Sequence, residues 1–169
     1  MMKKKLLAAV CAAALLLAFS GCSVISNLLG QGTEGKIGSK MKTEWFTFTV
    51  DSAEVVTSYA GYSPASGNVL VDIVVTETNT TSSAQPMGTF DFVLDDPADT
   101  EYYQLPLDPL DDTMMPSEFE LAAGQTVTYH LLFEVAEAST DLKLQFTEEY
   151  TDSSGSEGTG NTYVVTLGI

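Results

Sequence analysis

The sequence predicts an all-β domain, an antiparallel β-sandwich of immunoglobulin type with seven to eight short strands. Three observations predict this fold. In several segments after residue 41, apolar and polar residues alternate with a period of two, which is typical of strands with one buried face. The connections between these segments are rich in Gly, Ser, Pro, Asn and Asp, the residues that turns favour. No stretch from 41 to 169 carries a convincing helical stripe.

The expected strands follow one another at short intervals. The two clearest are 68–78, which reads NVLVDIVVTET, and 125–135, which reads QTVTYHLLFEV. Shorter strands are expected at 45–50, continuing to 56 after a bend, and at 90–94, 102–103, 118–121, 142–146 and 163–167. The long connections at 57–67, 96–117 and 148–161 favour a sandwich with decorated ends or strands that change sheets over a closed barrel, whose strands would be more evenly spaced.

Strand parity separates inward from outward side chains. His130, the only histidine, and Glu134 fall on the outward parity, where solvated side chains are expected, and Leu132 is an apolar exception on that face. Gly124 is expected in the turn before this strand, where a positive φ is tolerated. The predicted inward residues of the central strands are Val71, Ile73, Leu131 and Phe133, and the same alternation places Phe90 on one face with Phe92 and Leu94.

The N-terminus carries an export signal. Three lysines precede an apolar run of 14 residues, Leu6 to Phe19, which is short for a membrane span of roughly 20 residues. The sequence Phe19-Ser20-Gly21-Cys22 resembles the lipobox of bacterial lipoproteins, which implies diacylglycerol attachment to Cys22 and cleavage just before it. Because Cys11 would be removed, Cys22 would be the only cysteine of the mature chain, and lipidation explains it.

Three parts of the chain are therefore expected. Residues 1–21 form a lipoprotein signal peptide, 22–40 a lipidated cysteine and flexible glycine-rich tether, and 41–169 the sandwich domain. Four lysines and 23 acidic residues remain after cleavage, so the mature chain has a formal charge of −19. Because an anionic leaflet repels such a domain, attachment to the membrane is expected to rest on the acyl chains.

Composition also excludes several functions. The seven basic residues are all lysines, and the chain has no arginine. Nucleic-acid binding is excluded because it needs clusters of Lys and Arg. Phosphate chemistry is disfavoured without arginine forks, and zinc is disfavoured because one histidine and no free cysteine remain.

Three segments carry a family resemblance. They read NVLVDIVVTETNTTSSAQP, FDFVLDDPADTEY and LAAGQTVTYHLLFEVAE, and they resemble the strands and turns of a family of small extracellular bacterial lipoproteins. The resemblance implies a telokin-like immunoglobulin fold over about residues 40–146. The family has no established common activity, so no functional residues carry over.

Two groups of residues are candidate sites. The acidic turn after the 90–94 strand offers a calcium site at Asp95, Asp96 and Asp99, because calcium takes carboxylate oxygens from loops; the alternative is a solvated negative surface. Tyrosine and methionine are frequent at recognition surfaces, and those of the long connections are candidate binding-loop residues: Tyr59, Tyr62, Tyr102, Tyr103, Met114 and Met115.

The sequence favours a membrane-anchored extracytoplasmic lipoprotein that acts as a non-enzymatic binding module for an extracellular protein, peptide or glycan. No catalytic residues and no cofactor, calcium aside, are expected. The alternative is a tethered cell-wall glycan hydrolase, or an accessory to one, that uses surface carboxylates. Such an enzyme needs two carboxylates about 5–10 Å apart in a cleft.

Overall fold

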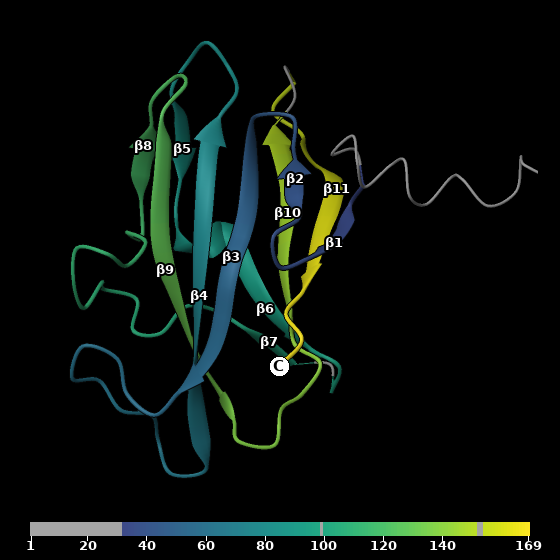
Figure 1. Cartoon of the computed structure of the whole chain (residues 1–169). Coiled ribbons are helices and arrows are strands. Elements are labelled where there is room, and N and C mark those ends of the chain that lie inside the picture. The colour runs from purple at the N-terminus through teal and green to yellow at the C-terminus, as the bar shows by residue number, and fades with distance from the viewer. Residues whose placement is uncertain (1–31, 99, 152–153) are drawn as a thin grey trace, which may run out of the picture.

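The structure, a computed structural model, describes residues 32–98, 100–151 and 154–169. Its strands form a β-sandwich (Figure 1), so the predicted all-β class is confirmed. A five-stranded sheet has the order β1-β11-β10-β6-β7, a four-stranded sheet has the order β2-β3-β4-β9, and β5 pairs with β8. In these residues the one helical element is η1, a single 3₁₀ turn at Thr89–Asp91.

The strand bounds are as follows. The four-stranded sheet contains β2 (Lys40–Lys42), β3 (Phe46–Val56), β4 (Asn68–Asn79) and β9 (Thr126–Ala136). The five-stranded sheet contains β1 (Glu34–Lys36), β6 (Phe92–Asp96), β7 (Thr100–Tyr102), β10 (Lys143–Thr151) and β11 (Glu157–Thr166), and the remaining pair is β5 (Gln85–Met87) with β8 (Phe119–Leu121). All pairings are antiparallel except that of β1 with β11. The structure has more strands than the seven to eight predicted, because three-residue strands such as β1 and β5 are too short to show a period.

The core lies between the two large sheets. Val71, Ile73, Leu131 and Phe133 are all 0% exposed, which confirms the predicted parity of β4 and β9. Phenylalanines from both sheets meet edge to face, as Phe46 and Phe146 do with ring centroids 4.9 Å apart. Gly124 has a φ of +71° in the turn before β9, as predicted.

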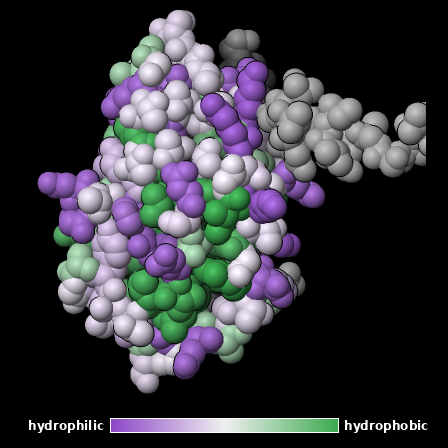
Figure 2. Space-filling model, in the orientation of Figure 1, coloured by the Kyte–Doolittle hydropathy of each residue, from purple (hydrophilic) through white to green (hydrophobic). Residues whose placement is uncertain are grey.

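A second, smaller apolar cluster covers the outer face of β4 and β9. Leu70, Leu132 and Met114 are buried in it, which explains the apolar Leu132 on the outward parity. The segment before β8 docks against the edge of β9, where His130 N–H donates to Thr113 O (2.8 Å) and Met115 N–H donates to His130 O (2.9 Å). Figure 2 shows hydrophobic side chains gathered in the lower half of the face that it presents.

Part of the predicted tether belongs to the domain. Residues 34–36 form β1 and pair with Val164–Thr166 of β11. Ile37 packs against the core, and Gly38, with a φ of +83°, donates its N–H to Val50 O. Gly35 and Gly38, which were assigned to the tether, therefore belong to the folded domain. Residues 22–31 lie outside the described residues, and their role as a tether stays a prediction.

Two further expectations were wrong. Phe90 does not share a face with Phe92, because it lies in η1 and is 56% exposed. The expected long connection at 148–161 is mostly strand, because β10 and β11 continue as one hairpin from Lys143↔Thr166 to Thr151↔Glu157 and stay in one sheet. A bulge between Thr147 and Glu149 breaks the alternation of β10. The sequence pattern therefore predicted only the first half of this strand.

His130 and Glu134 lie on the outer face of β9, but both have partners. His130 Nδ1 lies 2.8 Å from Asp72 Oδ1. The carboxylate of Glu134 accepts hydrogen bonds from the Tyr62 hydroxyl (2.7 Å) and the Ala65 N–H (2.9 Å), and a third from the Asn68 side chain (2.8 Å). The expectation that both side chains are freely solvated was therefore wrong, because the long connections fold back over this face.

Replacing Glu134 by alanine should lower the free energy of unfolding by about 1–3 kcal/mol, because three hydrogen bonds to a charged acceptor are lost. Urea unfolding of residues 32–169 would measure the change. Glu120→Ala, on the exposed side of β8, is the control and should stay within about 0.5 kcal/mol of the wild type. Equal stability of the two variants would show that Glu134 does not hold the 57–67 connection.

Candidate functional site

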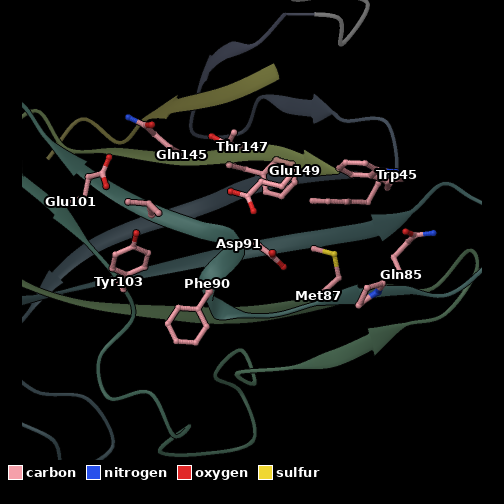
Figure 3. A pocket seen from close by; sticks show the side chains of 14 residues that line it. Trp45, Gln85, Met87, Phe90, Asp91, Glu101, Tyr103, Gln145, Thr147 and Glu149 are labelled. Carbon is pink, nitrogen blue, oxygen red and sulfur yellow. The ribbon is translucent and has the colours of Figure 1, made fainter. Parts of the chain in front are cut away.

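A groove opens where the five-stranded sheet is incomplete. β6 pairs with β10 only along Lys143–Phe146, whereas β10 continues to Thr151. The groove beside this free stretch has a volume of about 400 Å³ and is named here the Asp91 groove (Figure 3). Its lining includes the core residues Phe46, Met87 and Phe146. It is a concave site with an apolar base, the kind of surface that ligands use.

Besides the core residues Phe46 and Phe146, three aromatic side chains line the groove. Trp45 and Met87 lie on one side of Asp91, and Phe90 and Tyr103 on the other (Figure 3). Phe90 is 56% exposed and Tyr103 47% exposed, and their ring centroids are 6.2 Å apart. Exposed aromatic rings in a concavity offer apolar contact area to a partner.

The turn before β3 holds Trp45 in place. Thr43 Oγ1 accepts hydrogen bonds from the N–H groups of Trp45 (3.2 Å) and Phe46 (3.0 Å). The Trp45 carbonyl accepts one from Thr80 N–H (3.0 Å), and the Glu148 carboxylate accepts one from Glu44 N–H (2.9 Å). Trp45 is thus positioned by its own turn and by two segments distant in sequence, at Thr80 and Glu148.

The η1 turn holds Asp91 and Phe90. Asp91 Oδ2 accepts a hydrogen bond from Gly88 N–H (2.7 Å), while the Asp91 N–H donates to Gly88 O (3.2 Å). A Cβ at Gly88 would lie 2.1 Å from the carbonyl oxygen of Ser117. Gly88 is therefore required by the close approach of another backbone segment.

Gly88→Ala should destabilise the protein by about 1–3 kcal/mol, because backbone atoms must move to accept the methyl group. It should also displace η1 and change the fluorescence of Trp45 across the groove. Thermal melting and the emission spectrum would measure both. Gly155→Ala is a useful comparison, because that glycine has a φ of +83° and open space around it: it should cost stability through strain but leave the emission unchanged.

The carboxylates of the groove act on one another. Burial raises the pKa of Asp91, the hydrogen bond from Gly88 opposes this, and the charge of Glu149 raises it further. Burial also raises the pKa of Glu77 to about 8, and the charge of Asp91 adds to this effect. Glu77 is 0% exposed, and within the described ranges neither of its carboxylate oxygens has a hydrogen-bond partner. An acid of this kind favours a neutral form or a nearby cation.

The structure places the predicted calcium ligands apart. Asp95 and Asp96 are neighbours in β6 and so point to opposite faces, and Asp99 lies outside the described residues. Hydrogen bonds from Ser139 and Ala98 lower the pKa of Asp96. Among the residues that the structure describes, no group of three His, Cys, Asp or Glu is placed to hold a metal ion.

The predicted binding-loop residues have different positions. Tyr103 lines the groove, Tyr102 packs against the core, and Tyr59 and Tyr62 pack on the outer cluster. Met114 and Met115 are 1% and 0% exposed, so their assignment to an exposed binding surface was wrong: the connection folds its apolar residues inward. Cys22 lies outside the described residues, and its lipidation stays a prediction.

Sequence reasoning did not identify Trp45, Phe90, Asp91 or Glu149 as site residues. Two signals were present: Trp45 is the only tryptophan, and Phe90-Asp91 breaks the expected strand at its start. Neither signal connects these residues to Glu149, which lies on β10.

The fold and the groove define the protein as a β-sandwich domain. A groove lined by aromatic and acidic side chains lies beside the part of β10 that β6 leaves unpaired. No protein-family model and no curated protein matches the chain. Its structure is similar to that of the yjhA protein of Bacillus subtilis, with a TM-score of 0.59 and 20% identity over 79% of this chain and 99% of that one. The part of the chain that the structure describes has no helix with the length and apolarity to cross a bilayer.

Two other solved structures share the fold. One is ycdA of Bacillus subtilis, described as a "putative lipoprotein", with a TM-score of 0.55 and 17% identity over 76% of this chain; the alignment spans 38% of the length of ycdA. The other is the secreted protein MPT63 of Mycobacterium tuberculosis, with a TM-score of 0.55 and 14% identity over 68% of this chain and 88% of that one. At these identities the similarity shows the fold alone.

Proposed function

We propose that this protein is an extracytoplasmic lipoprotein, anchored through Cys22, and that it acts as a non-enzymatic binding module through the Asp91 groove. The observation that carries the proposal is the set of solvent-accessible aromatic side chains in one concave site, namely the exposed Phe90 and Tyr103 and the half-buried Trp45. The lipobox-like sequence supports the anchor, and structural neighbours named as lipoprotein and secreted proteins are consistent with it. The partner class is an extracellular protein, peptide or glycan.

Photo-crosslinking in intact cells tests the binding site. A photoreactive amino acid at Phe90, which is 56% exposed in the groove, should crosslink one dominant partner. The matched control is the same amino acid at Val55, which is 53% exposed on β3 and does not line the groove. Adducts at Val55 but not at Phe90 would place the binding surface elsewhere.

Cys22→Ser should release the protein from membranes, because two buried acyl chains hold a protein stably and this variant has none. Cell fractionation and the intact mass of the mature chain measure this. Cys11→Ser is the control, because that residue lies inside the predicted signal peptide. A Cys22→Ser protein that stays in the membrane fraction would contradict the anchor.

A glycan hydrolase is the second candidate, and one observation favours it. Asp91, with its raised pKa, and Glu149 share a groove with Trp45, and an acid of raised pKa near a second carboxyl group is the arrangement of glycosidases. Purified protein should then release soluble fragments from peptidoglycan, and both Asp91→Asn and Glu149→Gln should abolish this. No release by the wild type would leave the binding module as the function.

A further inference from the structure

We propose that the partner of the Asp91 groove presents a basic peptide segment, whose lysine or arginine side chains lie against Asp91, Glu101 and Glu149. This inference rests on the proposed binding function and names the chemistry of the ligand. It combines the charge of the groove, its aromatic side chains and a buried acid beside it.

The charge of the groove is complementary to that of a cationic ligand. Asp91, Glu101 and Glu149 line the groove, whereas none of the four lysines in the described residues does. Figure 3 shows the carboxylates of Asp91 and Glu149 near the middle of the groove and that of Glu101 at one end. An anionic segment would bring further negative charge to this surface without a counter-charge. A cationic one would remove the mutual repulsion of Asp91 and Glu149.

The aromatic residues suit the same ligand. Lysine and arginine have apolar stems that pack on rings, and their charged ends are attracted to ring faces. Trp45, Phe90 and Tyr103 supply such faces on both sides of Asp91. A carboxylate flanked by accessible aromatic rings therefore complements both the apolar stem and the charged end of a basic side chain.

Glu77 provides an independent observation. It is fully buried, and both of its carboxylate oxygens lack a donor among the described residues. The buried Thr89 Oγ1 of η1 likewise has no hydrogen-bond partner among them. Asp91 is the charged group that acts on Glu77. Buried polar atoms without partners are rare in native proteins and call for a specific cause. A positive charge held at Asp91 would stabilise the Glu77 carboxylate as well.

The form of the groove favours a peptide over a single small amine. Its carboxylates come from β7, η1 and the part of β10 that β6 leaves unpaired, and Figure 3 shows Glu101 at one end of the groove, apart from Asp91 and Glu149. Several cations in a row match this arrangement better than one ammonium group does. An extended chain places every second side chain on one face and can supply several cations in a row.

The test uses Trp45 as the reporter, because it is the only tryptophan and lines the groove. The probe is a blocked nine-residue peptide of serine and threonine with lysine at its third, fifth and seventh positions. Its matched form has glutamine at those positions, and n-butylammonium represents a small amine. Titrations use the mature chain at physiological ionic strength, with Asp91→Asn and Glu149→Gln as groove variants. Glu54→Gln, exposed on β3, is the charge-matched control.

The lysine peptide should change the Trp45 fluorescence saturably, and each groove variant should weaken binding about tenfold or more, since each lost charge-assisted hydrogen bond contributes about 1.5–3 kcal/mol. Glu54→Gln should bind like the wild type, and the glutamine peptide and n-butylammonium should bind much more weakly. Equal binding of the lysine and glutamine peptides, equal weakening by Glu54→Gln, or n-butylammonium binding as tight as the peptide would overturn the inference. So would no binding of the lysine peptide.

Failure of this inference is distinguishable from failure of the proposed function. If the Phe90 photo-crosslink identifies a partner whose crosslinked segment is neutral or acidic, the groove binds but the basic-peptide inference is wrong. If no crosslink depends on the groove, the proposed binding site itself is wrong.

Discussion

Replacing Glu77 by glutamine should remove a pH dependence from the stability of the protein. In the folded protein, burial raises the pKa of Glu77 from the ordinary value of 4.5 to about 8. Between these values the unfolded chain releases the proton and the folded protein keeps it. The wild type therefore loses stability as the pH rises, by about 1.4 kcal/mol per unit for this one group. Glutamine does not ionise and should not show this loss.

The measurement is chemical unfolding of wild type and Glu77→Gln from pH 4 to pH 9. The difference in free energy of unfolding, variant minus wild type, should be constant below pH 4.5, grow up to about pH 8 and then level off. At pH 7 we expect the variant to be more stable by about 1–3 kcal/mol, because the amide still lacks a partner and this offsets part of the gain. Glu120→Gln, exposed on β8, should follow the wild type. Parallel curves for wild type and Glu77→Gln would show that Glu77 is ionised in a solvated site.

Phe133→Ala should lower the free energy of unfolding by about 3–5 kcal/mol, because it leaves a large cavity between the sheets. Phe133 is 0% exposed on β9 and is paired with Val71 of β4, which is equally buried. Ile73→Val removes one methylene from the same core and should cost about 0.5–1.5 kcal/mol. If lost packing is the cause, the loss of stability should be larger for Phe133→Ala than for Ile73→Val; if the core tolerates no substitution, the two losses should be similar.

Urea unfolding of residues 32–169 would measure both variants. The fragment starts at 32, because a start at 40 would remove β1 and leave the outer edge of β11 unpaired. A loss below about 1 kcal/mol for Phe133→Ala would contradict the central position of β9 in the core.

The binding and hydrolase proposals differ in what Asp91 does. In binding, the Asp91 carboxylate is a fixed negative charge, and Asp91→Asn weakens affinity. In hydrolysis, the protonated acid donates its proton, and Asp91→Asn abolishes turnover while glycan binding at Trp45 persists. Affinity and turnover measured on the same variant therefore separate the two functions.

Much of the fold could be predicted from local sequence. The alternation in 68–78 and 125–135 placed Val71, Ile73, Leu131 and Phe133 correctly, because burial on one face of a strand repeats every two residues. The same rule failed at Phe90, where a 3₁₀ turn replaces the strand start, and at Thr147–Glu149, where a bulge shifts the register. The alternation of apolar and polar residues does not show where a 3₁₀ turn or a bulge interrupts a strand.

The sequence by itself determined the strand class, the inward faces of the central strands and a strongly acidic surface with no arginine. Only the tertiary structure decided the site. Trp45, Asp91 and Glu149 come from the turn before β3, from η1 and from β10, and they meet because β6 begins only at Phe92, opposite Phe146, whereas β10 continues past this point. It likewise decided the burial of Met114 and the pairing of β1 with β11. These features depend on which distant segments pair and where each pairing stops, and alternation within one segment carries no information about its partner.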